Sequence, residues 1–398
     1  MQSGIYPEKR VCITGIGQSA VGRPSPHSAL RLTVDACRQA ILDAGLTAAQ
    51  VDGLVTYPGA SADPSGIAPI GTTDAMFALG IDPTWVCSTT EGHNHMGAIV
   101  AAIEAIAAGL CRHVLVFRTV AQASARAVKR HASVLGGGSE EGTIVRGGFQ
   151  WSLPFNAYSP AHLFALYAQA YLDKYGATQD QLGAVAVNGR CWAAHNPNAI
   201  YRTPITIDDY MSSRIVSSPL RVLDCDTHID GSTAILLSHR NAAYELKREP
   251  IEIESMGISL GGIGVGLHLG DFTSLRSDKA GAMLWSRTDL KPADVDLAQI
   301  YDGFSIHTLM WLESLGLCGR GEAAAFVAGG KRIGPGGDLP LNTSGGQLSA
   351  GRFHGFGHTH EACLQLWGRA GERQVQNARV CVVSNGGFGF GALLLRRG

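Results

Sequence analysis

The sequence lacks the features of a membrane, secreted or nucleic-acid-binding protein. No uninterrupted apolar run reaches the roughly 18 residues of a membrane span, and the N-terminal MQSGIYPEKRVCITGIG has no basic region followed by a long apolar stretch. Charged residues make up only 16% of the chain, the net charge is −1, and no basic run occurs. We therefore expect a soluble, cytoplasmic protein that acts on a small molecule.

Paired cysteines are also missing. The nine cysteines contain no CxxC pair, which excludes an obvious structural zinc site, and their odd number fits reduced thiols in the cytosol. What is abundant is glycine, with 51 residues, alongside 45% apolar residues. This composition fits an α/β enzyme with many tight turns between strands and helices. At 398 residues, the chain could form two domains or one large pseudo-symmetric unit.

The order of apolar patterns predicts two similar series of elements. A β-branched run at 11–16 precedes helical spacing over 27–45, which predicts a strand followed by a helix. The first series continues with a strand near 51–57, a helix at 96–109 and a strand at 113–120, and an inserted loop region follows from 121 to about 218. The second series has strands at 234–238 and 250–258, a helix and strand from about 276, and the terminal run VCVVSNGGFGFGALLLRR. We expect a mostly parallel sheet.

The most informative segment is NTSGGQLSAGRFHGFGH at 342–358. Its five glycines let backbone amides approach a ligand closely. Arg352 adds a fixed cation, and His354 and His358 add groups that titrate near neutrality. A carbonyl or anionic substrate is implied. Elsewhere, His228 and Asp230 in DCDTHIDGSTA are expected to serve hydrogen bonding in a turn.

Several blocks of the chain resemble successive blocks of one protein family. They are LYAQAYLDKYGATQDQLGAVAVNGRCWAAHNPNA, ITIDDYMSS, SSPLRVLDCDTHIDGSTAILLS, IYDGFSI and NTSGGQLSAG. Together they are similar to the sterol-carrier-protein-x and lipid-transfer-protein branch of the thiolase superfamily. The resemblance implies a five-layered αβαβα thiolase fold built from two pseudo-symmetric halves, and a homodimer. The halves would be residues 1–245, with a loop domain at about 119–218, and residues 246–398.

The groups that perform thiolase chemistry are replaced in this chain. A thiolase needs a cysteine thiolate at a helix N-terminus, and the aligned position is Gly92. The late Cys-x-Gly motif aligns with VSNG at 383–386, again without a thiol, and the histidine of Gly-His-Pro aligns with Arg352. Arginine cannot act as a base under ordinary conditions but can bind an oxyanion or carboxylate. Covalent acyl transfer is thus lost, while a pocket with amide donors for a thioester enolate remains.

A tyrosine occupies the place of the family's Asn-Glu-Ala-Phe asparagine. Tyr301 can exchange a proton, and a cation such as Arg352 could stabilise its phenolate, since an unperturbed tyrosine has a pKa of ~10. The pattern is similar to that of the steroid side-chain-cleaving aldolases. The resemblance implies that these enzymes use tyrosines to cleave the side chain of a β-hydroxyacyl-CoA. Tyr301 matches one of these tyrosines. The second falls at Arg352, so a two-tyrosine mechanism does not carry over, although His354 and Gly355 match.

We therefore expect a lyase that cleaves a carbon–carbon bond of a β-hydroxyacyl-CoA by a retro-aldol reaction, in steroid side-chain degradation by the resemblance. CoA would be part of the substrate, with no other cofactor and no metal, because His93 and His95 have no convincing third ligand. The resemblance also implies a separate OB-fold/zinc-ribbon subunit. The candidate catalytic residues are Tyr301, Arg352, His354, His358, His93 and His95, and the candidate acyl-CoA-binding residues are Gly345, Gly346, Asn385 and Gly386.

Two alternatives remain open at this point. An acyl-CoA C-acyltransferase (β-ketothiolase) would need a cysteine outside the aligned position, and Cys87 is the nearest one. A non-catalytic carrier of acyl-CoA or lipid would keep the pocket and lose the chemistry.

Overall fold

The computed structural model describes residues 6–59, 65–89, 94–127, 153–157, 159–246, 248–260, 271–387 and 389–398. Within these ranges, nine strands form one sheet in the order β3-β2-β4-β7-β1-β8-β11-β10-β9, and two short strands pair separately. The large sheet consists of β1 (Val11–Gln18), β2 (Gly53–Thr56), β3 (Trp85–Ser88), β4 (His113–Ala121), β7 (Asp230–His239), β8 (Ile251–Leu260), β9 (Leu297–Gln299), β10 (Val380–Asn385) and β11 (Gly389–Arg397). The separate pair is β5 (Ile215–Ser217) and β6 (Leu220–Arg221).

The expectation of a mostly parallel sheet is wrong. β2 pairs parallel with both β3 and β4, and β9 pairs parallel with β10. The pairings of β4 with β7, β7 with β1, β1 with β8, β8 with β11 and β11 with β10 are all antiparallel. The last of these is a tight hairpin, which needs no crossover helix, and this is why the run of alternating strand and helix patterns overstated the parallel part.

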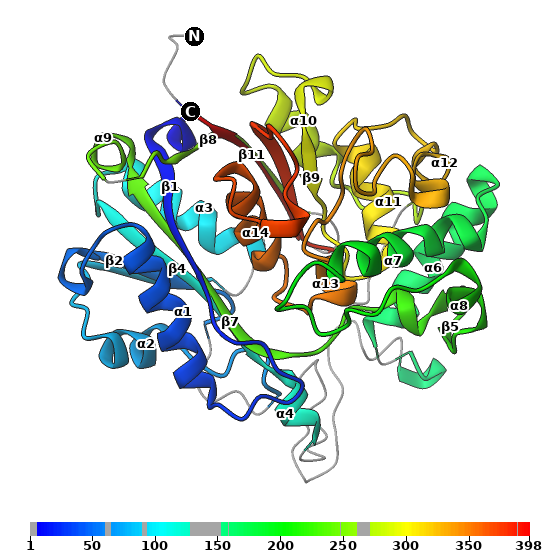
Figure 1. Cartoon of the computed structure of the whole chain (residues 1–398), viewed down its shortest axis with the longest axis horizontal. Coiled ribbons are helices and arrows are strands. Elements are labelled where there is room, and N and C mark those ends of the chain that lie inside the picture. Colours follow the sequence, from blue (N-terminus) through cyan, green and yellow to red (C-terminus); the bar gives the residue numbers. More distant parts are fainter. Residues whose placement is uncertain are drawn as a thin grey trace.

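The two halves of the sheet repeat one strand order. In the first half, the order from the edge is β3-β2-β4-β7-β1, and in the second it is β9-β10-β11-β8. The second half has no strand equivalent to β3 among the described residues; in its place, Leu341 forms an isolated parallel bridge to Ala298 of β9. Each parallel or antiparallel pairing in the first half has a pairing of the same direction at the equivalent place in the second half. The halves meet where Cys12 and Ile13 of β1 pair with β8, and Figure 1 shows them on either side of the centre, blue and cyan opposite yellow and red.

Helices complete five layers. The first half is covered on its outer face by α1 and the second by α10 and α11, while α3 and α14 lie between the halves and pack on strands of both (Figure 1). The α-helices of the described ranges are α1 (Ala29–Asp43), α2 (Thr72–Leu79), α3 (Asn94–Ala107), α4 (Gln122–Ala127), α6 (Pro160–Tyr175), α7 (Gln179–Ala193), α8 (Ile207–Ser212), α9 (Arg240–Ala243), α10 (Asp278–Trp285), α11 (Ser305–Ser314), α12 (Ala323–Val327), α13 (Gly346–Ser349) and α14 (Phe356–Leu366).

Alternating strand residues build the apolar cores between these layers. In β7, Ala234 and Leu236 face the core beneath α1, whereas Ile235 and Leu237 face the central core around α3 and α14. Strands β10 and β11 divide their residues in the same way between the central core and the core beneath α10 and α11. A strand buried on both faces loses the apolar–polar alternation of a half-exposed strand, which explains the continuous apolar runs in the sequence.

Local sequence signals set the ends of several helices. Ser28 caps α1 by accepting a hydrogen bond from the Arg31 amide, and Gly176 ends α6 in a left-handed conformation with φ of 63°. α6 and α7 belong to the long segment between β4 and β7 and pack on α11 and α12, which places this segment over the second half. None of the helices in the described ranges is long and apolar enough to cross a membrane.

Candidate active site

Tyr301 lies two residues after the end of β9, and its side chain is buried. Its amide donates to Ser384 Oγ at 3.0 Å, which fixes this loop against β10. Burial raises the pKa of Tyr301 and the charge of Asp226 raises it further, whereas Arg352 and a hydrogen bond with Gln347 lower it. Because the first two effects dominate, Tyr301 keeps its phenolic proton at neutral pH. The phenolate considered from the sequence is therefore not favoured, and Tyr301 is suited to donate a proton.

The guanidinium of Arg352 is already engaged within the chain. Its Nη1 donates to Asp226 Oδ1 and Oδ2 at 3.1 and 3.3 Å, and its Nη2 and Nε donate to Gln122 Oε1 at 2.6 and 3.1 Å. The amide of Arg352 donates to Thr227 O at 2.9 Å. Arg352 therefore joins the first turn of α4 to the segment before β7, and its charge is directed at Asp226.

Asp226 is a site residue that the sequence analysis did not single out. Its amide donates to Gly303 O at 3.2 Å, which places it beside the loop that carries Tyr301. Burial raises the pKa of Asp226 to about 6, although the charge and hydrogen bonds of Arg352 oppose the increase. A carboxylate with a pKa near 6 is mostly ionised at neutral pH and still basic enough to accept a proton. The sequence offered only one hint, an acidic residue two positions before His228.

His354 forms a pair with a buried arginine of the first half. Arg118 in β4 has Nη2 at 2.6 Å from His354 Nδ1. Since a guanidinium only donates hydrogen bonds, His354 accepts through Nδ1 and, when neutral, carries its proton on Nε2. His354 also has a φ of 53°, in the left-handed region that most side chains avoid. The pair connects the loop before α14 to the centre of the first half.

Tyr57 adds a second phenol that the sequence analysis missed. It directly follows β2, and the Arg118 guanidinium carbon lies 5.9 Å from the centre of its ring. Burial raises the pKa of Tyr57, and Arg118 partly offsets this. A charge on Tyr57 would in turn raise the pKa of Tyr301, so the two phenols share one electrostatic environment. A tyrosine at the carboxyl end of a parallel strand was the available signal.

The predicted glycine turn wraps around a carboxylate of the chain itself. Asp302 accepts hydrogen bonds from the amides of Gln347 and Leu348 at 2.9 and 3.4 Å. A Cβ on Gly346, whose φ is 62°, would lie 1.9 Å from Asp302 Oδ2, so only glycine fits. His358 Nε2 is 3.0 Å from Asp302 Oδ1, and both side chains are almost fully buried. His358 thus holds the residue that follows Tyr301.

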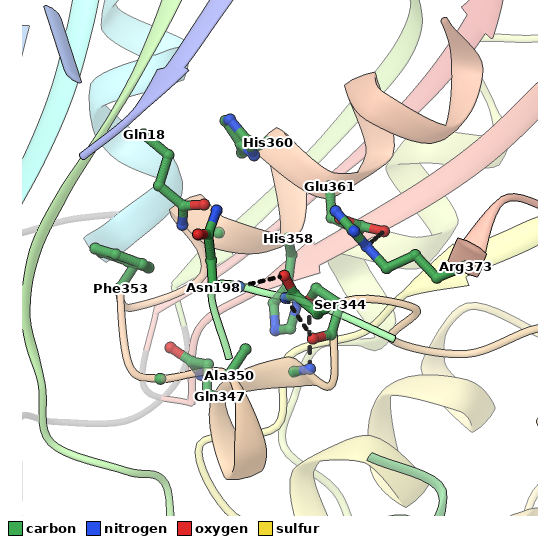
Figure 2. Close-up of a pocket in the computed structure, with 14 residues that line it drawn as sticks. Gln18, Asn198, Ser344, Gln347, Ala350, Phe353, His358, His360, Glu361 and Arg373 are labelled. Atoms are coloured by element: carbon green, nitrogen blue, oxygen red, sulfur yellow. Dashed lines mark hydrogen bonds and ion pairs between the residues drawn. The ribbon is translucent and has the colours of Figure 1, made fainter. Parts of the chain in front are cut away.

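A buried ion pair supports the other side of the turn. Glu361 of α14 accepts from Arg373 Nη2 at 2.9 Å and from Thr343 Oγ1 at 2.8 Å. Figure 2 shows Glu361 and Arg373 side by side at the small cavity between the turn and α14. This cavity, also lined by Gly346 and His358, has a volume of about 30 Å³, which suits a water molecule and not an acyl-CoA. Gly345, with a φ of 98°, lies at the start of α13 against Ala193.

Two buried polar side chains near the end of β10 have unused hydrogen-bonding atoms. Neither the oxygen nor the nitrogen of the Asn385 amide has a partner among the described residues, and its amide fills the space where Gly355 lacks a Cβ. His307 Nδ1 accepts from the Phe304 amide at 3.1 Å, so the neutral ring carries its proton on Nε2, which also lacks a partner. Burial lowers the pKa of His307 to about 3 and keeps it neutral. The carbonyl oxygen of Gly386, one of the predicted acyl-CoA-binding residues, accepts a hydrogen bond from Trp311 Nε1 at 3.0 Å.

The remaining candidates are less informative. His93 lies outside the described residues, and so does the side chain of His95. Cys87 lies in β3, and burial raises its pKa, which works against a reactive thiolate.

The arrangement combines an acid, a base and unused buried donors. Asp226 can accept a proton, Tyr301 can donate one, and His307 Nε2 and the Asn385 amide can donate hydrogen bonds to an oxygen that gains negative charge. Such a set can move a proton between two atoms of a substrate without a covalent intermediate.

Comparison with known proteins gives consistent relatives. A family model described as the thiolase C-terminal domain matches residues 267–393. The chain is 34% identical to the 17-hydroxy-3-oxo-4-pregnene-20-carboxyl-CoA lyase of Mycobacterium tuberculosis, over 97% of this chain and 99% of that protein. It is 32% identical to the steroid side-chain-cleaving aldolase of Thermomonospora curvata, over 96% and 97% of the two chains.

The fold has an equally clear relative among solved structures. A structure described as the Ltp2-ChsH2(DUF35) aldolase matches with a TM-score of 0.86 and 30% sequence identity, over 98% of both chains. The expected thiolase fold is confirmed by this match and by the five layers. The chain belongs to the thiolase superfamily, in the branch of the steroid side-chain-cleaving aldolases.

Proposed function

We propose that this protein is a lyase that cleaves a carbon–carbon bond of a β-hydroxyacyl-CoA by a retro-aldol reaction. The observation that carries the proposal is the pairing, at one site, of a carboxylate with a pKa of about 6 and a buried phenol that keeps its proton. A retro-aldol reaction needs both groups, because the β-hydroxyl group must lose a proton to a base and Cα of the acyl-CoA must gain a proton from an acid. The relatives named as a lyase and an aldolase support the same reaction.

The proposed steps use these two groups in turn. Asp226 accepts the proton of the β-hydroxyl group, the Cα–Cβ bond breaks, and Cβ becomes the carbonyl carbon of a ketone or aldehyde. The bonding electrons move into the acyl-CoA part as a thioester enolate. Tyr301 then donates its proton to Cα, and the proton held by Asp226 returns to the phenolate of Tyr301, which restores both groups. No cofactor or second substrate is consumed.

The enolate oxygen needs hydrogen-bond donors in a buried setting. His307 Nε2 and the Asn385 amide are buried donors without a partner among the described residues. A buried donor that is unsatisfied in the free protein stabilises an oxyanion at no cost of reorganisation, and each such donor contributes roughly 3 kcal/mol to the transition state. Arg352, held by Asp226 and Gln122, would act by orienting Asp226 and not by contacting the oxyanion.

The substrate class follows from the relatives. One relative is named for a pregnene carboxyl-CoA and another for steroid side chains, so we propose a bulky steroid-like acyl group. The solved relative is described with a DUF35 protein, and we propose that this chain also works with a separate small subunit, in keeping with the expected OB-fold/zinc-ribbon partner.

We further propose a cytoplasmic homodimer. The edge strand β3 supports this, because its outer side is unpaired among the described strands and Val86 is 46% exposed. An exposed edge with an apolar residue is a surface that a second copy can cover.

The test is to incubate the protein and its partner subunit with a β-hydroxyacyl-CoA steroid, and separately with the matching β-ketoacyl-CoA plus free CoA. Mass spectrometry should show a ketone or aldehyde and a shortened acyl-CoA from the first substrate only. CoA-dependent cleavage of the keto substrate would instead indicate a thiolase, and no product from either would indicate a carrier.

A further inference from the structure

A second cavity lies beside helix α4, next to the segment that carries Asp226. It has a volume of about 310 Å³, within the range of roughly 300–1,000 Å³ that is usual for small-molecule sites. Three segments line it: the turn after β1, helix α4 and the segment before β7. The lining residues are Arg23, Pro24, Ala123, Arg126, Ala127 and His228.

A buried carboxylate fixes the walls of this cavity. Asp230, the first residue of β7, accepts from the Ser25 amide at 2.9 Å and from the Ser124 amide and hydroxyl at 3.0 and 2.5 Å. Gly22 also pairs with Asp230 as an isolated antiparallel bridge. Asp230 thus joins the turn that carries Arg23 to the helix that carries Arg126. Its two oxygens are satisfied by neutral donors and neither binds an arginine of the cavity.

The cavity gathers positive charge that the described residues do not neutralise. Neither Arg23 nor Arg126 forms an ion pair within the described ranges; Arg23 stacks at 5.3 Å over the ring of Tyr201. Burial lowers the pKa of Arg126, and the charges of Arg352 and Arg23 lower it further. Asp226, the only carboxylate acting on Arg126 in this set, is already paired with Arg352.

The positive charge of the cavity also acts on His228. Burial lowers its pKa to about 2, and Arg352, Arg126 and Arg23 all contribute. His228 is therefore neutral and can serve as a hydrogen-bond donor or acceptor beside two arginines. Both arginines are exposed to solvent in the wall of the cavity, so an anion can reach them, and arginine binds carboxylates and phosphates through paired hydrogen bonds.

We propose that this cavity binds an anionic oxygen group, a carboxylate or a phosphate, carried by the acyl-CoA substrate. The proposal rests on the proposed function for the identity of the ligand. Arg352 is paired with Asp226, and its charge also acts on Arg126 and His228 of the cavity, so the cavity lies near the proposed base and a group of the same substrate can reach it. Two sources have this chemistry, the phosphates of CoA and a carboxylate at the far end of the acyl group.

Arg23→Gln and Arg126→Gln test the site, with Arg190→Gln as the matched control. Arg190 also stacks on Tyr201, at 4.6 Å, but does not line the cavity. Loss of one charge-assisted contact should raise KM for the substrate by about tenfold in each cavity variant and leave that of the control near the wild-type value. Equal KM values for the cavity variants and the control, with every substrate used, would overturn the proposal.

Three substrates distinguish the sources. They are a CoA ester with an uncharged β-hydroxyacyl group, its pantetheine analogue, and a CoA ester whose acyl group ends in a carboxylate. A CoA phosphate in the cavity predicts an effect with both CoA esters and none with the pantetheine ester. An acyl carboxylate predicts an effect with the third substrate only.

A separate readout keeps the cavity distinguishable from the reaction. If the wild-type protein cleaves none of these substrates, the proposed function fails, and calorimetric titration with free CoA and with inorganic phosphate tests the cavity alone. Binding that is weakened by Arg126→Gln and unchanged by Arg190→Gln would support an anion site. Binding that is absent or equal in all three proteins would overturn it.

Discussion

At the scale of single residues, burial separates two groups of one site into a base and an acid. Asp226 and Tyr301 are both shielded from water, which raises both pKa values. The pKa of the Asp226 carboxyl remains low enough for it to lose its proton near neutral pH. The pKa of the Tyr301 phenol rises further above neutrality, so the phenol keeps its proton. Arg352 cannot act as a base, but its charge keeps Asp226 mostly ionised. It therefore helps Asp226 to act as the base.

Tyr301→Phe should abolish most of the activity. The variant removes the proton donor to Cα while it preserves the ring, so kcat/KM for a β-hydroxyacyl-CoA should fall by roughly 10²–10⁴-fold. Tyr244→Phe is a suitable control, because it removes a phenol that donates a hydrogen bond to Glu252 at 2.6 Å, outside the site. Full activity of Tyr301→Phe in a steady-state assay would contradict the assignment.

The pH dependence of kcat should report Asp226. Below a pH of about 6 its carboxyl is protonated and cannot accept the hydroxyl proton, so kcat should fall as the pH decreases and stay level above neutrality. Asp226→Asn should lower kcat by roughly 10²–10⁴-fold and remove this acid limb. The exposed Asp208→Asn variant should keep the wild-type profile. An acid limb that survives in Asp226→Asn would assign the base to another group.

At the scale of elements, the site depends on how the turn at 342–346 is held against α14. Glu361 joins the two by accepting hydrogen bonds from Arg373, Thr343 and Gln365. On the opposite side, Asp302 binds the first amides of α13 and links them to the loop of Tyr301. The glycines of the turn are required because side chains there would overlap Asp302 and Ala193.

Glu361→Gln should destabilise the protein strongly. It leaves the nearly buried Arg373 without a counter-charge, which costs about 3–5 kcal/mol of unfolding free energy. The same substitution at Glu372, which is 82% exposed beside His195, should change the unfolding free energy by less than about 1 kcal/mol. Urea unfolding followed by circular dichroism measures both. Equal midpoints for the two variants would show that the buried pair does not support the turn.

The sequence predicted the regular elements better than the pairing of side chains. Periodicity placed strands at 11–16 and 113–120 and a helix at 27–45, close to β1, β4 and α1. It could not give strand direction, because a strand buried on both faces has the same apolar run in either direction. It also could not find Asp226 or the Arg118–His354 pair, because their contacts join positions 126 and 236 residues apart.

At the scale of the whole molecule, two halves with one strand order enclose α3 and α14 and bring their loops to one place. The first half contributes Arg118 and Tyr57, and the second contributes Tyr301 and His354. Family motifs found the second set, since they lie in recognisable blocks of sequence. The first set has no motif of its own and is defined only when the halves pack together.

The most direct test of this account is the rate at which a β-hydroxyacyl-CoA is cleaved, with no added CoA, before and after the accessible thiols are alkylated. Because Asp226 and Tyr301 transfer the protons and no sulfur takes part, the account predicts the same rate in both samples. Loss of cleavage on alkylation, with label on Cys87, would contradict it and show that the protein retains a cysteine-dependent mechanism.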